Sequence, residues 1–170
     1  MTIFFSKGDF LKNWIIPSAL CLLLLLCFGG WEVYANNLNF NQNAAQAAAS
    51  AAKKRYPLQK VESVSYYHGT RPWQVVKGVE HGKGVYIWVP DGKGRSAMFQ
   101  RYVSKGISEK EAVRRLNRLH LDVRKIISVR LGAIGQHPVW EVTFLNSKNN
   151  YNYLSFYFDN GKEAQRILNV

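Results

Sequence analysis

The sequence contains very few cysteines. Of its 170 residues only Cys21 and Cys27 are cysteine, and both lie within one apolar run. Beyond residue 31 the chain therefore has no disulfide, no thiol nucleophile and no cysteine ligand for zinc. The length excludes a large multidomain enzyme, and the 47% hydrophobic and 14% aromatic content excludes a wholly disordered chain.

Residue patterns typical of catalysis are also missing. The four histidines include no pair spaced by four residues and no HExxH motif, and no serine lies in a GxSxG-like elbow. Gly82-Lys83-Gly84 and Gly92-Lys93-Gly94 resemble fragments of phosphate loops, but neither has the strand–loop–helix context, which favours hairpin turns. A catalytic carboxylate pair formed by folding is the remaining alternative. We expect a protein that is not an enzyme and that uses no metal and no cofactor.

Acidic residues are outnumbered by basic ones. The 23 Lys and Arg against 11 Asp and Glu give a formal net charge of +12. Such a surplus favours an anionic partner, whether nucleic acid, lipid headgroups or a wall polymer. A solvated basic surface that keeps the domain soluble is the simpler alternative. The candidate basic surface on the second predicted helix consists of Arg114, Arg115 and Arg118.

Charge is absent from one long stretch, residues 14–31. At about 1.5 Å per residue this run spans roughly 27 Å, near the thickness of the hydrocarbon core of a bilayer. Trp14 and Trp31 stand at its two ends, where indole rings favour the headgroup region. The run therefore predicts a transmembrane helix in contact with the lipid bilayer.

The flanking charges predict the orientation of this helix. Lys7 and Lys12 precede the run, and the next basic residue is Lys53. The positive-inside rule then places residues 1–13 in the cytoplasm and the C-terminal domains outside, in a single-pass protein of the cell membrane. A signal peptide cleaved after Ala35 and a lipid on one of the cysteines are the alternatives. In the favoured topology the basic domains face away from the genome, so nucleic acid is not the expected partner.

Beyond the predicted membrane helix, the sequence changes from polar to alanine-rich. Residues 32–42 are polar and rich in asparagine, which indicates a linker. Residues 43–56 are rich in alanine, the strongest helix former, and their last turn carries basic residues that suit the helix dipole. Four strand-like segments follow, at residues 61–67, 73–77, 85–89 and 97–103. The turns between them leave no room for crossover helices, so they predict an antiparallel meander.

The same order of elements then occurs a second time. Ser108 and Glu111 form a capping box, with Ser108 as N-cap and Glu111 reaching back to it, at the start of a second helix. Strand-like segments follow at residues 126–131, 139–145, 151–158 and 164–168.

Equivalent positions in the two halves lie at a nearly constant distance. Pro72 and Pro138 are 66 residues apart, and Asp91 and Asp159 are 68 residues apart. This offset indicates a tandem repeat in an α+β protein, each unit a helix packed on an antiparallel sheet. The predicted domains are residues 43–104 and residues 105–170. Units of about 65 residues are marginal on their own, so we expect them to pack on each other.

Aromatic residues alternate with aliphatic ones along the strands, as Tyr86 and Trp88 do within residues 85–89. The aliphatic face should meet the helix of its unit, because successive side chains point to opposite faces. The aromatic face must then meet the other repeat, a partner protein or carbohydrate. Tryptophan and tyrosine are common interface hot spots, so these residues are candidates for partner binding. The candidates are Trp73, Tyr86, Trp88, Tyr151, Tyr153 and Tyr157.

Five short stretches together resemble a known family. They are Val75-Val76-Lys77-Gly78, Val85-Tyr86-Ile87-Trp88-Val89-Pro90, Gly106-Ile107-Ser108-Glu109, Trp140-Glu141-Val142-Thr143-Phe144, and Tyr153-Leu154-Ser155-Phe156-Tyr157 followed by Asp159 and Gly161-Lys162. In this order they resemble the TseB-like (YpmB-like) family, single-pass proteins of Gram-positive bacteria that regulate cell-wall elongation. The resemblance covers most of the predicted exterior region.

The resemblance implies two tandem cystatin-like (PepSY-like) domains. It also implies a non-enzymatic regulator of peptidoglycan synthesis that binds a class B penicillin-binding protein, a transpeptidase, outside the membrane. This chain departs from the family in its strongly basic charge and its alanine-rich first helix. A PepSY-type protease-inhibitory module and a binder of anionic wall polymer or lipid are the alternative functions.

Overall fold

The structure, a computed structural model, describes residues 7–91 and 97–170; in α1 it describes the side chains of residues 15, 17–28, 30, 31 and 41–55. It divides into two units, Met1–Asn43 and Ala44–Val170. Trp14, at one end of the predicted membrane helix, and the Gly92-Lys93-Gly94 segment fall outside the described side chains and residues.

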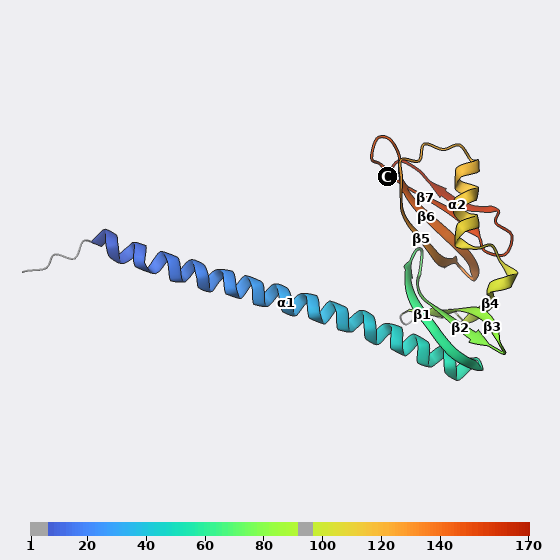
Figure 1. Ribbon diagram of the computed structural model, residues 1–170, viewed down its shortest axis with the longest axis horizontal. Coiled ribbons are helices and arrows are strands. Elements are labelled where there is room, and N and C mark those ends of the chain that lie inside the picture. Colours follow the sequence, from blue (N-terminus) through green and yellow to red (C-terminus); the bar gives the residue numbers. More distant parts are fainter. Residues whose placement is uncertain (1–6, 92–96) are drawn as a thin grey trace, which may run out of the picture. The chain divides into compact units, whose positions relative to one another are not determined.

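Helix α1 is one continuous helix, Lys7–Arg55 (Figure 1). Residues 32–42, which were expected to form a linker, are helical. These residues contain neither proline nor glycine, so nothing in them breaks the helix that flanks them on both sides. Pro17 lies inside the helix, which begins at Lys7.

Within the described residues, no helix combines the length and the apolar character that a membrane span needs.

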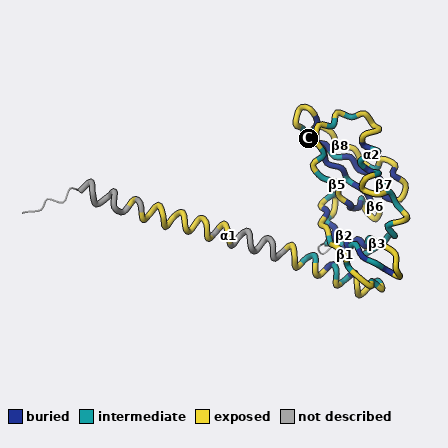
Figure 2. The backbone as a smooth tube through the Cα atoms, viewed as in Figure 1, coloured by how far each residue is buried: buried dark blue, intermediate teal, exposed yellow. Residues whose placement is uncertain are grey.

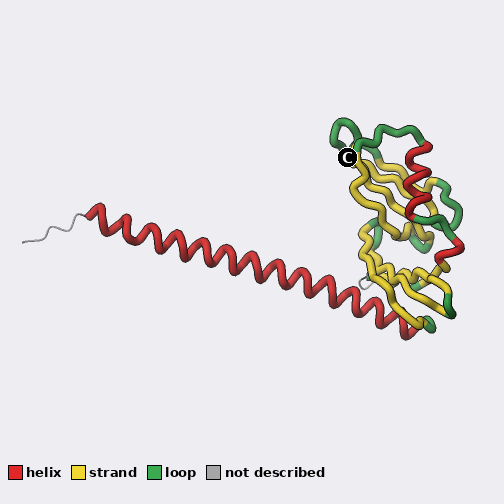
Figure 3. The backbone as a smooth tube through the Cα atoms, in the orientation of Figure 1, coloured by secondary structure: helices red, strands yellow, loops and turns green. Residues whose placement is uncertain are grey.

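The first repeat consists of the C-terminal part of α1, from Ala44, and a four-stranded antiparallel sheet (Figure 3). The strands are β1 (Leu58–His68), β2 (Pro72–Glu80), β3 (Lys83–Pro90) and β4 (Phe99–Tyr102), and a short 3-10 turn, Val103–Lys105, follows them. They pair in sequence order. Ala48 and Ala52 of α1 pack on the aliphatic side chains of this sheet, among them Val76 and Ile87. The expected contact between the alanine-rich helix and the aliphatic face is therefore confirmed.

The second repeat has the same order of elements. Helix α2 (Glu109–Arg118) precedes β5 (Lys125–Ile134), β6 (His137–Leu145), β7 (Tyr151–Tyr157) and β8 (Glu163–Ile167). These strands also pair in sequence order as an antiparallel sheet. Two helix-plus-meander units in one chain confirm the α+β class and the tandem repeat.

Helix α2 begins at the predicted N-cap. The hydroxyl of Ser108 accepts a hydrogen bond from the backbone N–H of Glu111. The carboxylate of Glu111, which was expected to reach back to Ser108, instead forms ion pairs with Arg114, Arg115 and Arg118. The hydrogen bond to the Ser108 hydroxyl is thus formed, whereas the carboxylate of Glu111 pairs with arginines of the next turn of α2.

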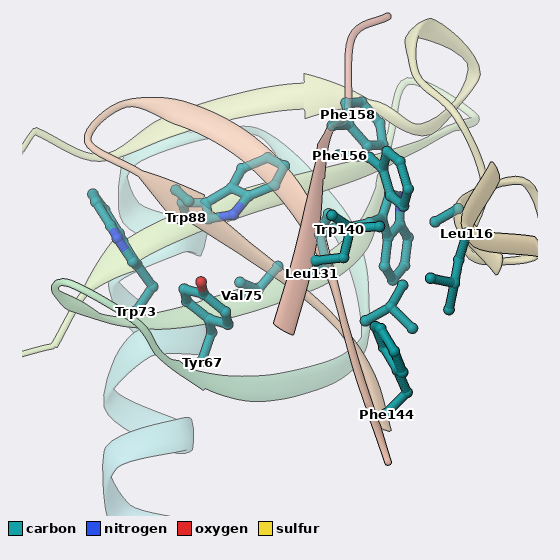
Figure 4. Packing of buried hydrophobic residues seen from close by; sticks show 14 residues of the cluster. Tyr67, Trp73, Val75, Trp88, Leu116, Leu131, Trp140, Phe144, Phe156 and Phe158 are labelled. Atoms are coloured by element: carbon teal, nitrogen blue, oxygen red, sulfur yellow. The ribbon is translucent and has the colours of Figure 1, made fainter. Parts of the chain in front are cut away.

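The two repeats share one aromatic core (Figure 4). Tyr67, Trp73 and Trp88 of the first repeat belong to the same buried cluster as Trp140 and Phe158 of the second. The indole N–H of Trp88 donates to the carbonyl oxygen of Gly132 at 2.9 Å. The expectation that the two repeats pack on each other is therefore confirmed.

Glycine at position 132 is required by this packing. A Cβ atom built there would lie 2.3 Å from the ring of Tyr67, far inside van der Waals contact. The ring of Tyr67 thus lies against the backbone of β5 at Gly132, where only glycine leaves room for it.

Candidate functional site

The aromatic residues proposed for partner binding fall into two groups. Trp73 and Trp88 are 1% and 0% exposed, and Tyr86 packs edge-on against Trp140 and Phe158. Burial between the repeats therefore accounts for Trp73 and Trp88, whereas Tyr86 is partly buried and packs against the same cluster. The other candidates, Tyr151, Tyr153 and Tyr157, belong to β7 of the second sheet and stay wholly or partly accessible (Figure 2).

Helix α2 covers only one face of the second sheet. Trp140, Val142, Leu154 and Phe156 belong to the buried cluster that includes Ala112 and Leu116 of α2. Alternate residues of the same strands must point the other way. We call this second surface the open face. Its cross-strand rows are Arg130, Glu141, Ser155 and Gln165, and next to it Ser128, Thr143, Tyr153 and Ile167.

A groove of about 330 Å³ lies on the open face. One wall comes from the end of β1 and the turn that follows it in the first repeat, and the rest comes from β6, β7 and β8. The lining residues are Tyr67, His68, Gly69, Thr70, Glu141, Tyr153, Ser155, Gln165 and Ile167. Its volume is at the lower end of the range of small-molecule pockets, which suits one side chain or a small headgroup.

Glu141 is the one carboxylate among the residues that line this groove. One of its oxygens, Oε2, accepts a hydrogen bond from the hydroxyl of Tyr67 at 3.0 Å. Loss of water around the half-buried carboxyl raises the pKa of Glu141, and the Tyr67 hydrogen bond and the nearby Arg130 oppose that rise. Burial, followed by the charge of Glu141, raises the pKa of Tyr67, so the phenol stays protonated and donates.

Nothing in the sequence alone marks Glu141 as part of a groove. The residue lies on the polar side of β6, as strand alternation indicates, but its hydrogen-bond partner comes from the other repeat, 74 residues away. Glu80 is a second carboxylate of this kind, since it is 3% exposed and accepts a hydrogen bond from the hydroxyl of Tyr102. No local pattern in the sequence could reveal either contact.

The predicted basic surface on α2 is partly neutralised. Arg114 and Arg118 are largely exposed, but both lie within ion-pair distance of Glu111. Arg115 also donates from Nη1 to the carbonyl oxygen of Gly161 at 3.0 Å, which ties α2 to the turn before β8. These arginines therefore stabilise the second repeat through their contacts and also contribute to its positive charge.

A denser group of exposed cations lies at one end of the first sheet. It combines the last turn of α1, the start of β1 and the β2–β3 turn, which are joined where the backbone N–H of Gly82 donates to the side chain of Gln59. We call it the basic end. Its exposed residues are Lys53, Lys54, Arg55, Lys60 and Lys83.

Within the part of the chain that the structure describes, no group of three or more His, Cys, Asp or Glu side chains comes together in a way that could hold a metal ion.

Comparisons with known proteins first define the class. The profile of a family described as "Cell wall elongation regulator TseB-like domain" matches residues 47–90, which run from the last turns of α1 to the end of β3. The solved structure of the YpmB protein from Bacillus subtilis superposes with a TM-score of 0.67 at 33% identity, covering 72% of this chain and 94% of that chain. The class is thus that of cell wall elongation regulators built from two α+β repeats.

A curated relative extends the match over most of the chain. The probable cell wall elongation regulator TseB of Bacillus subtilis (strain 168) is 31% identical over 137 residues, which is 80% of this chain and 84% of that protein. The chain belongs to the TseB-like (YpmB-like) family, as its sequence motifs indicated.

Proposed function

We propose that this protein regulates cell-wall elongation without catalysis, by binding a class B penicillin-binding protein, a transpeptidase, through the open face of its second sheet. Family membership supports the regulatory role. The observation that carries the binding role is the open face itself, where tyrosines remain accessible beside a groove although the matching face of the first sheet is buried.

The chemistry of the open face suits a protein partner. Tyr151 is 46% exposed and Ile167 is 43% exposed, and the side chains of Tyr153 and Tyr157 are half-buried. A rigid aromatic side chain with a polar hydroxyl contributes much contact area at low entropic cost, which is why tyrosine is enriched in interface hot spots.

Membrane anchoring is part of the proposal. The uncharged stretch of residues 14–31 supports it, as do the leucines at positions 22–26, which are all exposed on α1. An anchor confines the repeats to a thin layer at the membrane surface. Even a weak contact with a membrane-bound transpeptidase then gains from the high effective concentration.

Topology is tested directly in cells. A reporter that matures only outside the cytoplasm, fused after Val170, is expected to be active, and protease added to intact cells should remove it. A reporter that is silent outside and protected from protease would contradict the anchored, exterior arrangement.

Partner binding is tested by crosslinking from the open face. A photoreactive phenylalanine replaces Tyr151 or Tyr157 in the full-length protein in living cells, and the same residue replaces the exposed Ser63 on β1 as control. We expect the two open-face positions to capture the transpeptidase and the control position to capture much less. Recovery of no transpeptidase from either open-face position would overturn the proposal.

The basic end supports a second candidate function, binding of an anionic wall polymer or lipid. Five exposed cations at the basic end attract phosphate groups, and such attraction is screened within about 8 Å at physiological salt. The full-length protein should therefore bind polyglycerol phosphate at 50 mM salt and release it at about 500 mM. Binding that does not change with salt would exclude this function.

A further inference from the structure

We propose that the groove on the open face receives the side chain of a lysine or arginine from the protein partner. The inference rests on the proposed function for the existence of such a partner, and it adds which side chain of the partner the groove selects. The proposed occupant is a cationic side chain of a folded or extended protein segment that docks on the open face.

Charge is the first reason. Glu141 lines the groove and is the one carboxylate that does so, whereas the lining contains neither lysine nor arginine. Its half-buried carboxyl has lost part of its water, and this loss raises its pKa. A cation that enters the groove replaces the lost hydration with a direct charge contact, and an anionic side chain would be repelled there.

The remaining hydrogen-bonding capacity of Glu141 is the second reason. An ionised carboxylate offers about four acceptor sites on its two oxygens. The hydroxyl of Tyr67 occupies one site on Oε2 at 3.0 Å. Arg130 stands across from Glu141 on β5, but its contribution to the pKa is the smallest of the three causes, and its side chain is exposed. Acceptor sites on Glu141 thus remain for a donor from outside.

The walls of the groove are the third reason. Tyr153 and Ile167 contribute an aromatic ring and an aliphatic side chain, while Ser155, Gln165 and Thr70 contribute polar groups that can hydrogen-bond. Lysine and arginine need this combination, because their long apolar stems pack on apolar surface while their charged heads seek acceptors. An aromatic face near a cation adds attraction of its own. The volume of about 330 Å³ has room for one such side chain.

The proposal is tested with small cationic probes on the full-length protein in detergent micelles. The probes are N-acetyl-lysine methylamide and N-acetyl-arginine methylamide, with N-acetyl-norleucine methylamide as the uncharged match of lysine. The readout is the methyl NMR signal of Ile167, assigned by Ile167→Val. We expect the cationic probes to shift this signal and to bind about fivefold more tightly than norleucine, the size expected for a partly exposed charge pair.

Two variants make the result specific. Glu141→Gln removes the charge but can still accept the hydrogen bond from Tyr67, so the fold is retained; it should abolish the preference for the cationic probes. Gln165→Lys leaves Glu141 intact and places a cation of the chain itself at the groove, so it should weaken binding of both cationic probes. Glu62→Gln is the matched control, the same change at an exposed ion pair with Lys77 on the first sheet, and it should leave probe binding unchanged.

The outcomes separate this inference from the proposed function. Equal shifts from lysine and norleucine probes, no shift at Ile167, or an unchanged preference in Glu141→Gln would overturn the inference, even where the transpeptidase is still captured from Tyr151. Charge-selective binding that depends on Glu141 supports the inference, also where no transpeptidase is captured, and in that case the proposed partner alone is wrong.

Discussion

At the residue scale, the contact between Tyr67 and Gly132 connects the two repeats and the groove. The ring of Tyr67 lies on Gly132, and its hydroxyl donates to Glu141. The same side chain therefore belongs to the shared core and to the wall of the groove. A substitution at either contact should therefore affect both the shared core and the groove.

Gly132→Ala should destabilise the protein. The added Cβ would meet the Tyr67 ring at 2.3 Å, and overpacking of this kind costs about 1–3 kcal/mol. Urea unfolding of the two proteins measures the difference. Gly30→Ala is the matched control, because nothing lies within 4 Å of its added Cβ, and it should not lower stability. Equal stability of Gly132→Ala and the natural protein would contradict the packing described.

Glu141→Gln should change how stability depends on pH. The pKa of Glu141 is raised on folding, so above the ordinary glutamate pKa the folded protein holds a proton that the unfolded chain has released. Stability is therefore lost as pH rises through this window, and the glutamine variant lacks that loss. Relative to the natural protein, the variant should gain stability between about pH 4 and neutral pH.

The exposed Glu62 provides a contrast of opposite sign. Its hydrogen bond and ion pair with Lys77 lower its pKa, so its stabilising effect is present above the ordinary glutamate pKa and is lost as pH falls. Glu62→Gln should thus lose stability relative to the natural protein as pH rises. Urea unfolding at several pH values measures both variants, and equal slopes for the two would refute the assignment.

At the element scale, the strands and helices follow patterns that the sequence carries locally. Short segments rich in β-branched and aromatic residues, separated by turn residues, predicted all eight strands, and Ser108 marked the start of α2. The predicted linker at residues 32–42 is helical, because a helix already formed on both sides extends through residues that merely lack strong helix propensity. Local composition could not show this continuity.

The N-cap of α2 provides a test at this scale. Ser108→Ala removes the acceptor for the backbone N–H of Glu111 and should cost about 1 kcal/mol, the usual value for a lost cap. Ser108→Asp restores an acceptor and should recover most of this loss. Both are measured by urea unfolding, and an alanine variant as stable as the natural protein would show that the cap contributes nothing.

At the scale of the whole molecule, contacts between the repeats decide which predicted site residues are accessible. Equal sheet patterns made the aromatic residues of both repeats equally good candidates for partner binding. Trp73 and Trp88 are buried because the second repeat covers the first sheet, whereas Tyr151 remains exposed. The groove depends on the same arrangement, since Tyr67 and Glu141 come from different repeats. Such contacts between distant parts of the chain leave no local signal in the sequence.

The shared core should make the two repeats unfold together. Trp88 is fully buried and donates to Gly132 across the repeats, so Trp88→Ala leaves a cavity and removes this hydrogen bond. We expect a loss of about 3–5 kcal/mol, with one transition seen by far-UV circular dichroism and by tryptophan fluorescence. Two separate transitions in the natural protein would contradict a single core.

Duplicated modules usually multiply binding sites, as the units of a repeat array do. Here the second repeat covers the aromatic face of the first, and the indole N–H of Trp88 donates to the backbone of Gly132 instead of to a binding partner. Duplication has thereby left one aromatic face accessible, that of the second sheet. Under the proposed function, such a molecule would bind one transpeptidase at a time and would not bridge two of them.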